Sequence, residues 1–256
     1  MSALPFLLSI PHGGTEIPAE LTPHVVATPA QMAEDVDHFT REVFALREGK
    51  VAVVLESHTS RSFVDVNRDP SLYPPHDNDG AVKAISCTGH DLFGDWHPAE
   101  PMVERLLKRY WNPYHEALSE AVLAPGLKLA LDCHSMAPVG PSLAPDAGRP
   151  RPLICLGDRH GQSAPEGWVD RLAECFCQVF GLPAEQVVAN KPYSGGYITR
   201  RYGHNPLPFI QIEYSRALYM QPPHYRVEEH RLDEDWAAEM RRRFHKVLTL
   251  FHERVD

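Results

Sequence analysis

Two histidines in this sequence follow apolar runs that have the character of buried strands. His12 comes soon after the run 6–10 and precedes two glycines, and His134 comes soon after the run 127–131. Ligands of open α/β sheets bind beyond the carboxyl ends of the strands, so two imidazoles placed there could converge on one metal ion. The chain has 15 histidines, and most of them must serve at the surface or in packing. The metal-site interpretation therefore depends on finding a third ligand.

A carboxylate is expected as that ligand, because Zn²⁺ accepts His, Asp and Glu and a catalytic zinc keeps one position for water. Glu16, Asp35 and Asp37 are the candidates. Glu16 is close to His12 in sequence, although a surface position before Pro18 also explains it. Asp35 and Asp37 lie at the start of a helical pattern, where aspartate is common as a helix cap. Residue types and spacing leave all three open.

A cluster of arginine and asparagine occupies the segment 60–69, where alternating apolar residues favour a short strand. Arg61, Asn67 and Arg68 belong to this cluster. Arginine binds carboxylates through paired hydrogen bonds, so the segment is a candidate for contact with an anionic ligand. Structural ion pairs with the aspartates of the same segment, including Asp65, are the alternative.

The segment 193–203 combines a double glycine with aromatic and arginine side chains, among them Tyr197 and Arg200. This composition favours a binding loop, and a plain glycine turn is the alternative. Further along the chain, Glu213 ends an apolar run. A buried acid is costly unless it is paired or functional. A carboxylate beside a metal site is a natural general base.

The elements that must position these residues are typical of an α/β protein, which we expect to form a single domain over residues 1–256. The predicted strands are continuous apolar runs, as in a sheet covered on both faces: 6–10, 51–55, 127–131, 153–156 and 208–212. Helical patterns cover 103–122, with a kink or division at Pro113, and also 168–180 and 236–251. The segments 69–101 and 137–151 have little periodicity and are predicted to be long loops, either lids or surface excursions.

Charge and composition exclude several classes of function. The 25 Lys and Arg against 34 Asp and Glu give a net charge of −9, which argues against a broad nucleic-acid surface. No apolar stretch reaches the roughly 20 residues that span a bilayer, and no leader pattern is recognisable, so we expect a cytoplasmic protein. The five cysteines show no zinc-ribbon or disulfide spacing, which fits a reducing compartment.

Taken together and in order, these motifs resemble the N-formylglutamate amidohydrolase family. The matching segments are 9–14, 35–37, 60–68, 132–135, 195–200 and 211–220. The family is similar in fold to zinc carboxypeptidases and aspartoacylases. The resemblance therefore implies an α/β fold with a central mixed, mostly parallel sheet flanked by helices.

The resemblance also implies roles for individual residues. His12 and His134 match the metal histidines, Asp37 matches the third ligand better than Asp35, and Glu213 matches the catalytic glutamate. Glu16 remains an alternative to Asp37 as the third ligand.

Around the metal, Asn67 and Arg68 look like the pair that holds a substrate carboxylate in the carboxypeptidases. Arg61 lies where an arginine that polarises a carbonyl would be expected, and Tyr197 and Arg200 are further candidates for substrate contact. The loops 69–101 and 137–151 match no pattern of the family.

The function implied is zinc-dependent hydrolysis of a small N-acyl amino acid, with N-formyl-L-glutamate, giving glutamate and formate, as the leading candidate. A deacylase or carboxypeptidase-like enzyme for another acyl group or a peptide is the alternative. A metal-free protein that binds a dicarboxylate is a third hypothesis. Another divalent metal could replace zinc. The expected partner is a small carboxylate substrate, and the sequence indicates no oligomeric state.

Overall fold

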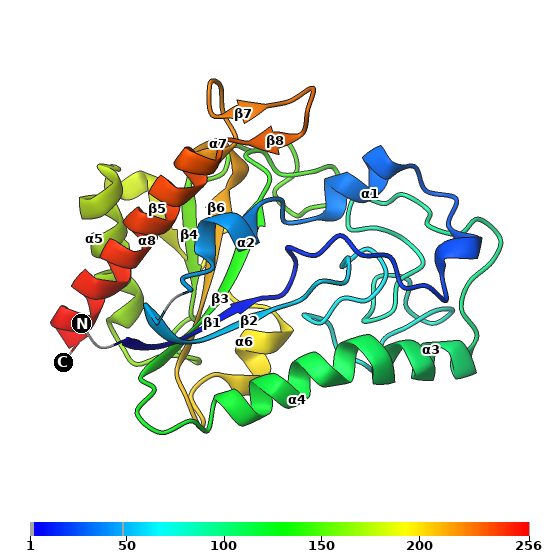
Figure 1. The fold of residues 1–256 in the computed structure, drawn as a ribbon, viewed down its shortest axis with the longest axis horizontal. Helices are drawn as coiled ribbons and strands as arrows, with labels where there is room; N and C mark the ends of the chain where they lie inside the picture. Colours follow the sequence, from blue (N-terminus) through cyan, green and yellow to red (C-terminus); the bar gives the residue numbers. More distant parts are fainter. Residues whose placement is uncertain (1–2, 48, 256) are drawn as a thin grey trace.

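A computed structural model describes residues 3–47 and 49–255. Its centre is a six-stranded sheet with the strand order β2-β1-β3-β6-β4-β5 (Figure 1). The strands are β1 (Leu4–Ile10), β2 (Val51–Glu56), β3 (Leu129–Met136), β4 (Ile154–Gly157), β5 (Val187–Ala189) and β6 (Phe209–Ser215). All neighbours are parallel except β4 and β6, which run antiparallel. The predicted mixed, mostly parallel sheet is confirmed.

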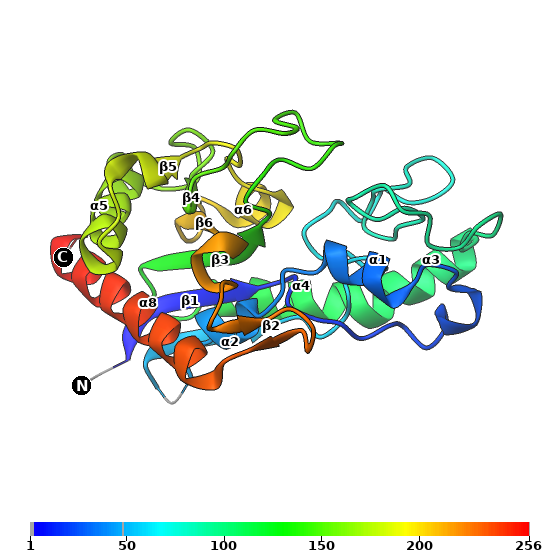
Figure 2. The same cartoon turned by 90° about the horizontal axis from the view of Figure 1, so that it is seen from above.

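Helices cover both faces of this sheet (Figures 1 and 2). On one face lie α2 (Thr40–Phe44), α5 (Trp168–Phe180) and α8 (Glu234–Val255). On the other lie α3 (Glu100–Leu106), the π-helical turn η2 (Leu107–Trp111), α4 (Asn112–Ala121) and α6 (Tyr197–Tyr202). The shorter elements are η1 (Thr22–His24), α1 (Pro29–Asp35), η3 (Ala184–Gln186), α7 (Arg216–Tyr219) and the hairpin β7 (Tyr225–Arg226) and β8 (Arg231–Leu232). None of the helices in the described residues has the length and apolar content needed to cross a membrane.

The two faces of the sheet differ in the polarity of their side chains toward the carboxyl ends of the strands. Residues of β3 alternate between the faces, as in any strand. Leu129, Leu131 and Cys133 belong to the apolar core under α5 and α8. On the opposite face Ala130 joins the core under α4, and Asp132 and then His134 follow it at two-residue steps. This second face therefore turns from apolar to polar toward the carboxyl ends of the strands.

Three local predictions differ from the structure. The strand β3 extends to Met136 and includes His134, because β6 pairs with it along this whole length. The segment 60–69 forms turns rather than a strand, and only Val64 makes a bridge, with Val82. Its apolar side chains are buried all the same, so their alternation reflects packing in a turn. The predicted binding loop at 193–203 is irregular only up to Gly196, because α6 begins at Tyr197 and buries Ile198 in the core.

The two long irregular segments differ in how they pack. Figure 2 shows the segment 69–101 beside α1 and α3, beyond the end of the sheet. Its residues Val82, Leu92 and Phe93 are buried in the second core. The segment 137–151 forms only isolated bridges, and Arg151 at its end holds Asp146 with hydrogen bonds of 2.7 and 2.8 Å. The segment 69–101 is thus partly buried in the core, whereas most residues of 137–151 are exposed and the contacts named here lie within the segment itself.

Candidate metal centre

Three buried side chains bring ligand atoms together at the polar end of the sheet. His12 Nδ1 and His134 Nδ1 are 3.1 Å apart. Asp37 Oδ2 lies 3.5 Å from the His12 nitrogen and 3.2 Å from the His134 nitrogen. Among the described residues this is the group of histidine and acidic side chains whose geometry could hold a metal ion.

These spacings fit a small tetrahedral cation. Ligand bonds of about 2.0–2.1 Å at tetrahedral angles place the ligand atoms of Zn²⁺ about 3.4 Å from one another, close to the three separations above. The charge state of Asp37 also suits a metal ligand. Burial alone would raise the pKa of Asp37, but the hydrogen bonds from His12 and His134 outweigh it and lower that pKa. The carboxylate is therefore ionised and available as a ligand.

Local backbone contacts fix the position of each ligand. Asp37 lies between α1 and α2, where its backbone N–H donates to the carbonyl of His12 at 3.1 Å. Its carboxylate accepts from the backbone N–H of Ser135 at 3.2 Å. The turn after β1 needs glycine, because a Cβ on Gly14 would lie 2.2 Å from the backbone carbonyl carbon of His58. The turn that follows His12 is thus in close contact with the backbone of His58, just after β2.

The second ring nitrogen of each histidine faces a carboxylate. His12 Nε2 donates to Asp65 Oδ1 at 2.7 Å. His134 Nε2 lies at ion-pair distance, 3.1 Å, from Asp132 Oδ2. Such carboxylates fix the tautomer and the ring orientation of metal-binding histidines. Both contacts leave Nδ1 of the histidine facing the candidate metal site. The sequence did not predict this role for either aspartate.

Asp65 is held as an ion in the protein interior. Arg61 donates to its Oδ2 at 3.0 Å, and the fully buried ammonium of Lys83 lies 3.6 Å from the same atom. Burial raises the pKa of Asp65, but His12, Arg61 and Arg68 together lower it well below its usual value. The ion pairs suggested for Asp65 therefore exist, and they serve the orientation of His12.

The two other carboxylates considered as ligands point elsewhere. Asp35 is the last residue of α1, and its Oδ1 accepts from the backbone N–H of Cys87 at 2.7 Å. This contact ties the segment 69–101 to α1. Glu16 is exposed, and its backbone bridges to Thr59. Asp37 is the carboxylate that lies within reach of both histidines.

Glu213 lies directly across from His134 in the parallel pairing of β3 and β6. Residues paired in this way project to the same face of a sheet, so the carboxyl group is next to the candidate ligands. Gln211, two residues earlier on the same face, donates to Glu213 Oε1 at 2.8 Å. Burial is the main cause that raises the pKa of Glu213, to about 8. The side chain is a desolvated acid beside a candidate metal site, as expected of a general base.

A cavity of about 630 Å³ opens over the three ligand atoms and Glu213. Both irregular segments contribute to its walls, with Cys87 and Thr88 from one and Leu143 and Arg151 from the other. Volumes of this order suit small ligands. The segments 69–101 and 137–151 therefore form part of the wall of the cavity.

The predicted substrate-contact residues occupy different positions. Arg61, Asn67 and Arg68 line the cavity. The amide of Asn67 is engaged by the protein itself, since Oδ1 accepts from the backbone N–H of Ile198 at 2.8 Å and Nδ2 lies 3.3 Å from His134 Nε2. Arg68 is 3.4 Å from Asp79.

Tyr197 and Arg200 are not among the residues that line this cavity. They belong to α6, and the guanidinium of Arg200 lies over the Tyr197 ring at 5.6 Å. Arg200 is exposed to solvent. Helix α6 packs Ile198 and Tyr202 into the core, whereas Tyr193, earlier in the same segment, lines the cavity.

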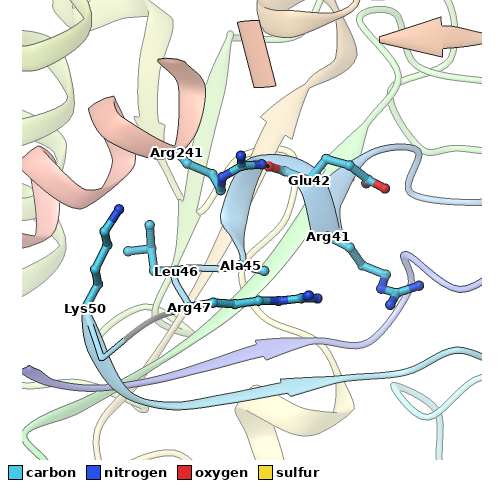
Figure 3. Close-up of a pocket in the computed structure, with 7 residues that line it drawn as sticks. All are labelled: Arg41, Glu42, Ala45, Leu46, Arg47, Lys50 and Arg241. Atoms are coloured by element: carbon cyan, nitrogen blue, oxygen red, sulfur yellow. Dashed lines mark hydrogen bonds between the residues drawn. The ribbon is translucent and has the colours of Figure 1, made fainter. Parts of the chain in front are cut away.

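A second hollow, of about 490 Å³, lies between α2, α8 and the start of β2 (Figure 3). Arginine and lysine side chains dominate its lining, which consists of Arg41, Glu42, Ala45, Leu46, Arg47, Lys50 and Arg241. Two of its arginines, Arg41 and Arg47, pair with Glu56. It contains no member of the histidine–aspartate group, so the chemistry belongs to the larger cavity.

Comparison with known proteins relates this chain to a family and to solved structures. A family model described as N-formylglutamate amidohydrolase matches residues 4–220. The crystal structure of N-formylglutamate amidohydrolase from Ralstonia eutropha JMP134 is 26% identical, with a TM-score of 0.78 over 100% of this chain and 95% of that one. A gene product of Agrobacterium tumefaciens is 19% identical, with a TM-score of 0.65 over 99% and 92%, which supports the fold.

A metallo-carboxypeptidase from Burkholderia cenocepacia is 13% identical, with a TM-score of 0.40 over 98% of this chain and 57% of that one. A search among curated proteins returned no match.

Proposed function

Because the chain belongs to the N-formylglutamate amidohydrolase family, we propose that it hydrolyses N-formyl-L-glutamate to glutamate and formate with a bound divalent metal ion, Zn²⁺ being the leading candidate. The observation that carries this proposal is the convergence of two imidazole nitrogens and a carboxylate oxygen within 3.1–3.5 Å of one another. A buried glutamate stands beside them in a cavity of suitable size. Metal-assisted hydrolysis of an amide needs these components.

His12, Asp37 and His134 would hold the ion. When bound, Zn²⁺ lowers the pKa of a water molecule and polarises a carbonyl group. Three protein ligands leave the fourth position open for water or substrate, which distinguishes a catalytic zinc site from a structural one. The orientation of the two imidazoles by Asp65 and Asp132 suits the same role.

Glu213 is the residue proposed to move the proton. Its carboxylate accepts a proton as water attacks the formyl carbon, and it then delivers that proton to the leaving amino nitrogen. Burial makes the carboxylate a stronger base than an exposed glutamate. The hydrogen bond from Gln211 keeps Oε1 in place, so the carboxyl group is held at one side of the metal centre throughout the reaction.

Arg61 is proposed to stabilise the negative charge that develops on the carbonyl oxygen. Its Nε is buried, and within the described residues it has no hydrogen-bond acceptor. A buried donor without a partner is costly, and a substrate oxygen would satisfy it. Arg68, which lines the same cavity, is proposed to bind the α-carboxylate. Asn67 is proposed to brace this wall through its contacts with His134 and Ile198.

A substrate panel with quantified metal tests this proposal. The protein is purified without chelator, its metal content is measured, and N-formyl, N-acetyl and N-succinyl derivatives of glutamate are compared by kcat/KM. We expect bound divalent metal and fastest turnover of the N-formyl compound. Equal or faster turnover of another acyl group would instead identify a deacylase. A metal-free protein whose ligand binding survives the substitution His12→Ala would be a binding protein and not an enzyme.

A further inference from the structure

Four guanidinium groups line the cavity, and they differ in whether the protein already neutralises them. Arg61 donates to Asp65 at 3.0 Å, Arg68 lies 3.4 Å from Asp79, and Arg151 holds Asp146 at 2.7 Å. Arg216 also lines the cavity. No carboxylate of the described residues forms an ion pair with Arg216.

The position of Arg216 follows from the strand that precedes it. It begins α7 directly after β6 ends at Ser215, and Ser215 pairs with Met136 at the end of β3. Arg216 therefore lies at the same edge of the sheet as His134 and Glu213. The Ser215 hydroxyl accepts from the backbone N–H of Ala217 at 3.3 Å, which caps this short helix and holds the start of α7 against the cavity.

The charge of the cavity makes an unpaired cation significant. Five acidic side chains line it: Glu34, Asp35, Asp37, Asp79 and Glu213. The chain as a whole carries a net charge of −9. Each carboxylate of a substrate that leaves water for this cavity needs a cation that the protein does not already neutralise. Arg216 supplies such a cation from α7, whereas Arg68 comes from the turns of the segment 60–69.

We infer that Arg216 binds the side-chain carboxylate of the substrate and so selects N-formyl dicarboxylic amino acids over neutral ones. This inference rests on the proposed function, because it assumes that an N-formyl amino acid is the substrate. Arg68 would take the carboxylate common to all amino acids, and Arg216 the one that distinguishes glutamate. A guanidinium is suited to this task because it binds a carboxylate with two parallel hydrogen bonds.

A pair of nearly isosteric substrates tests the inference. N-formyl-L-glutamine has the shape of N-formyl-L-glutamate but lacks the second negative charge. We expect Arg216→Gln to lower kcat/KM for the glutamate compound by about 10- to 100-fold, which corresponds to the loss of a charge-assisted hydrogen bond. Most of that loss should be in KM. Turnover of the glutamine compound should change by less than about 3-fold, within the ordinary effect of a surface substitution.

The matched control is Arg171→Gln, which removes an exposed arginine from α5. It should leave kcat/KM for both substrates unchanged. Thermal unfolding of both variants establishes that they are folded. An equal loss on the two substrates would show that Arg216 acts on their common part or on the fold, and it would overturn the inference. Unchanged turnover of the glutamate compound would overturn it as well.

A binding measurement separates this inference from the proposed function. If the wild-type protein hydrolyses neither N-formyl compound, the proposed function fails. Calorimetric binding of glutarate and of its monoamide, glutaramate, to the metal-loaded protein then decides the role of Arg216 alone. A loss of affinity in Arg216→Gln confined to glutarate would support carboxylate recognition. Equal affinities of the variant and the wild-type protein for glutarate would contradict it.

Discussion

Glu213 is a carboxyl group whose environment sets it apart from the other acids of the site. Asp37 and Asp65 are surrounded by histidine and arginine, which lower their pKa values. Within the described chain no cation forms an ion pair with Glu213, and burial raises its pKa to about 8. Acids and bases with separated pKa values perform different tasks in one site. At the residue scale this difference supports the proposed roles, metal binding for Asp37 and proton transfer for Glu213.

The substitution Glu213→Gln keeps the size of the side chain and removes the base. We expect kcat to fall by about 10²- to 10⁴-fold, the usual contribution of a positioned general base. The metal content should not change, because Glu213 does not belong to the ligand group. Steady-state kinetics and elemental analysis of the same preparation measure both quantities. Near wild-type turnover would refute the mechanism, and the exposed Glu120→Gln serves as the control.

The apolar runs before His12 and His134 predicted that the two imidazoles could converge, and the structure brings them together. The place of Glu213 beside them was predicted from the family resemblance. The roles of Asp65 and Asp132 were not predicted. For Asp132 a signal existed, since residues two apart on a strand share a face and Asp132 precedes His134 by two. For Asp65 there was none, because its contact with His12 spans 53 residues and depends on the turns of the segment 60–69.

At the scale of elements, β3 and β6 form the platform of the site. Asp132 and His134 on β3 pair with Gln211 and Glu213 on β6, so four polar residues project from one face. Both strands were predicted from their apolar residues, but their polar ends were left out of the predicted bounds. A prediction based on apolar residues alone ends each strand before the polar residues that form the site. The segments 69–101 and 137–151 were unpredictable in detail, since turns without periodicity take their shape from long-range contacts such as Asp35 with Cys87.

Asp132→Asn tests whether β3 orients its own histidine. We expect the metal affinity to fall by about 10- to 100-fold, the usual cost of losing a carboxylate that supports a metal-binding histidine. The physical reason is that a neutral amide oxygen attracts the Nε2–H of His134 less strongly than a carboxylate does, so the orientation of the ring is held less firmly. Competition with a chromophoric zinc chelator measures the affinity. An affinity equal to that of the exposed control Asp170→Asn would show that Asp132 has no such role.

At the scale of the whole molecule, the metal centre joins distant parts of the chain. His12 follows β1, Asp37 lies between two helices, and His134 belongs to β3. The unfolded chain cannot hold these groups together, so a metal ion bound by them would bind the folded protein selectively and add its binding free energy to stability. In the metal-free protein His134 binds a proton more readily than an exposed histidine does. Burial lowers its pKa, but the carboxylates of Asp132 and Asp37 outweigh burial and raise that pKa.

Zinc should therefore raise the melting temperature of the metal-free protein, and the increase should be larger at pH 8 than at pH 6. At a free concentration of about 100 times Kd the gain is about 2.7 kcal/mol, or about 5–10 °C for a chain of this size. A histidine with a raised pKa stabilises the metal-free fold at low pH and loses that contribution as pH rises. Protons thus compete with the metal most strongly at pH 6. Differential scanning calorimetry at both pH values measures the shift, and an equal shift in His134→Ala would place the ion elsewhere.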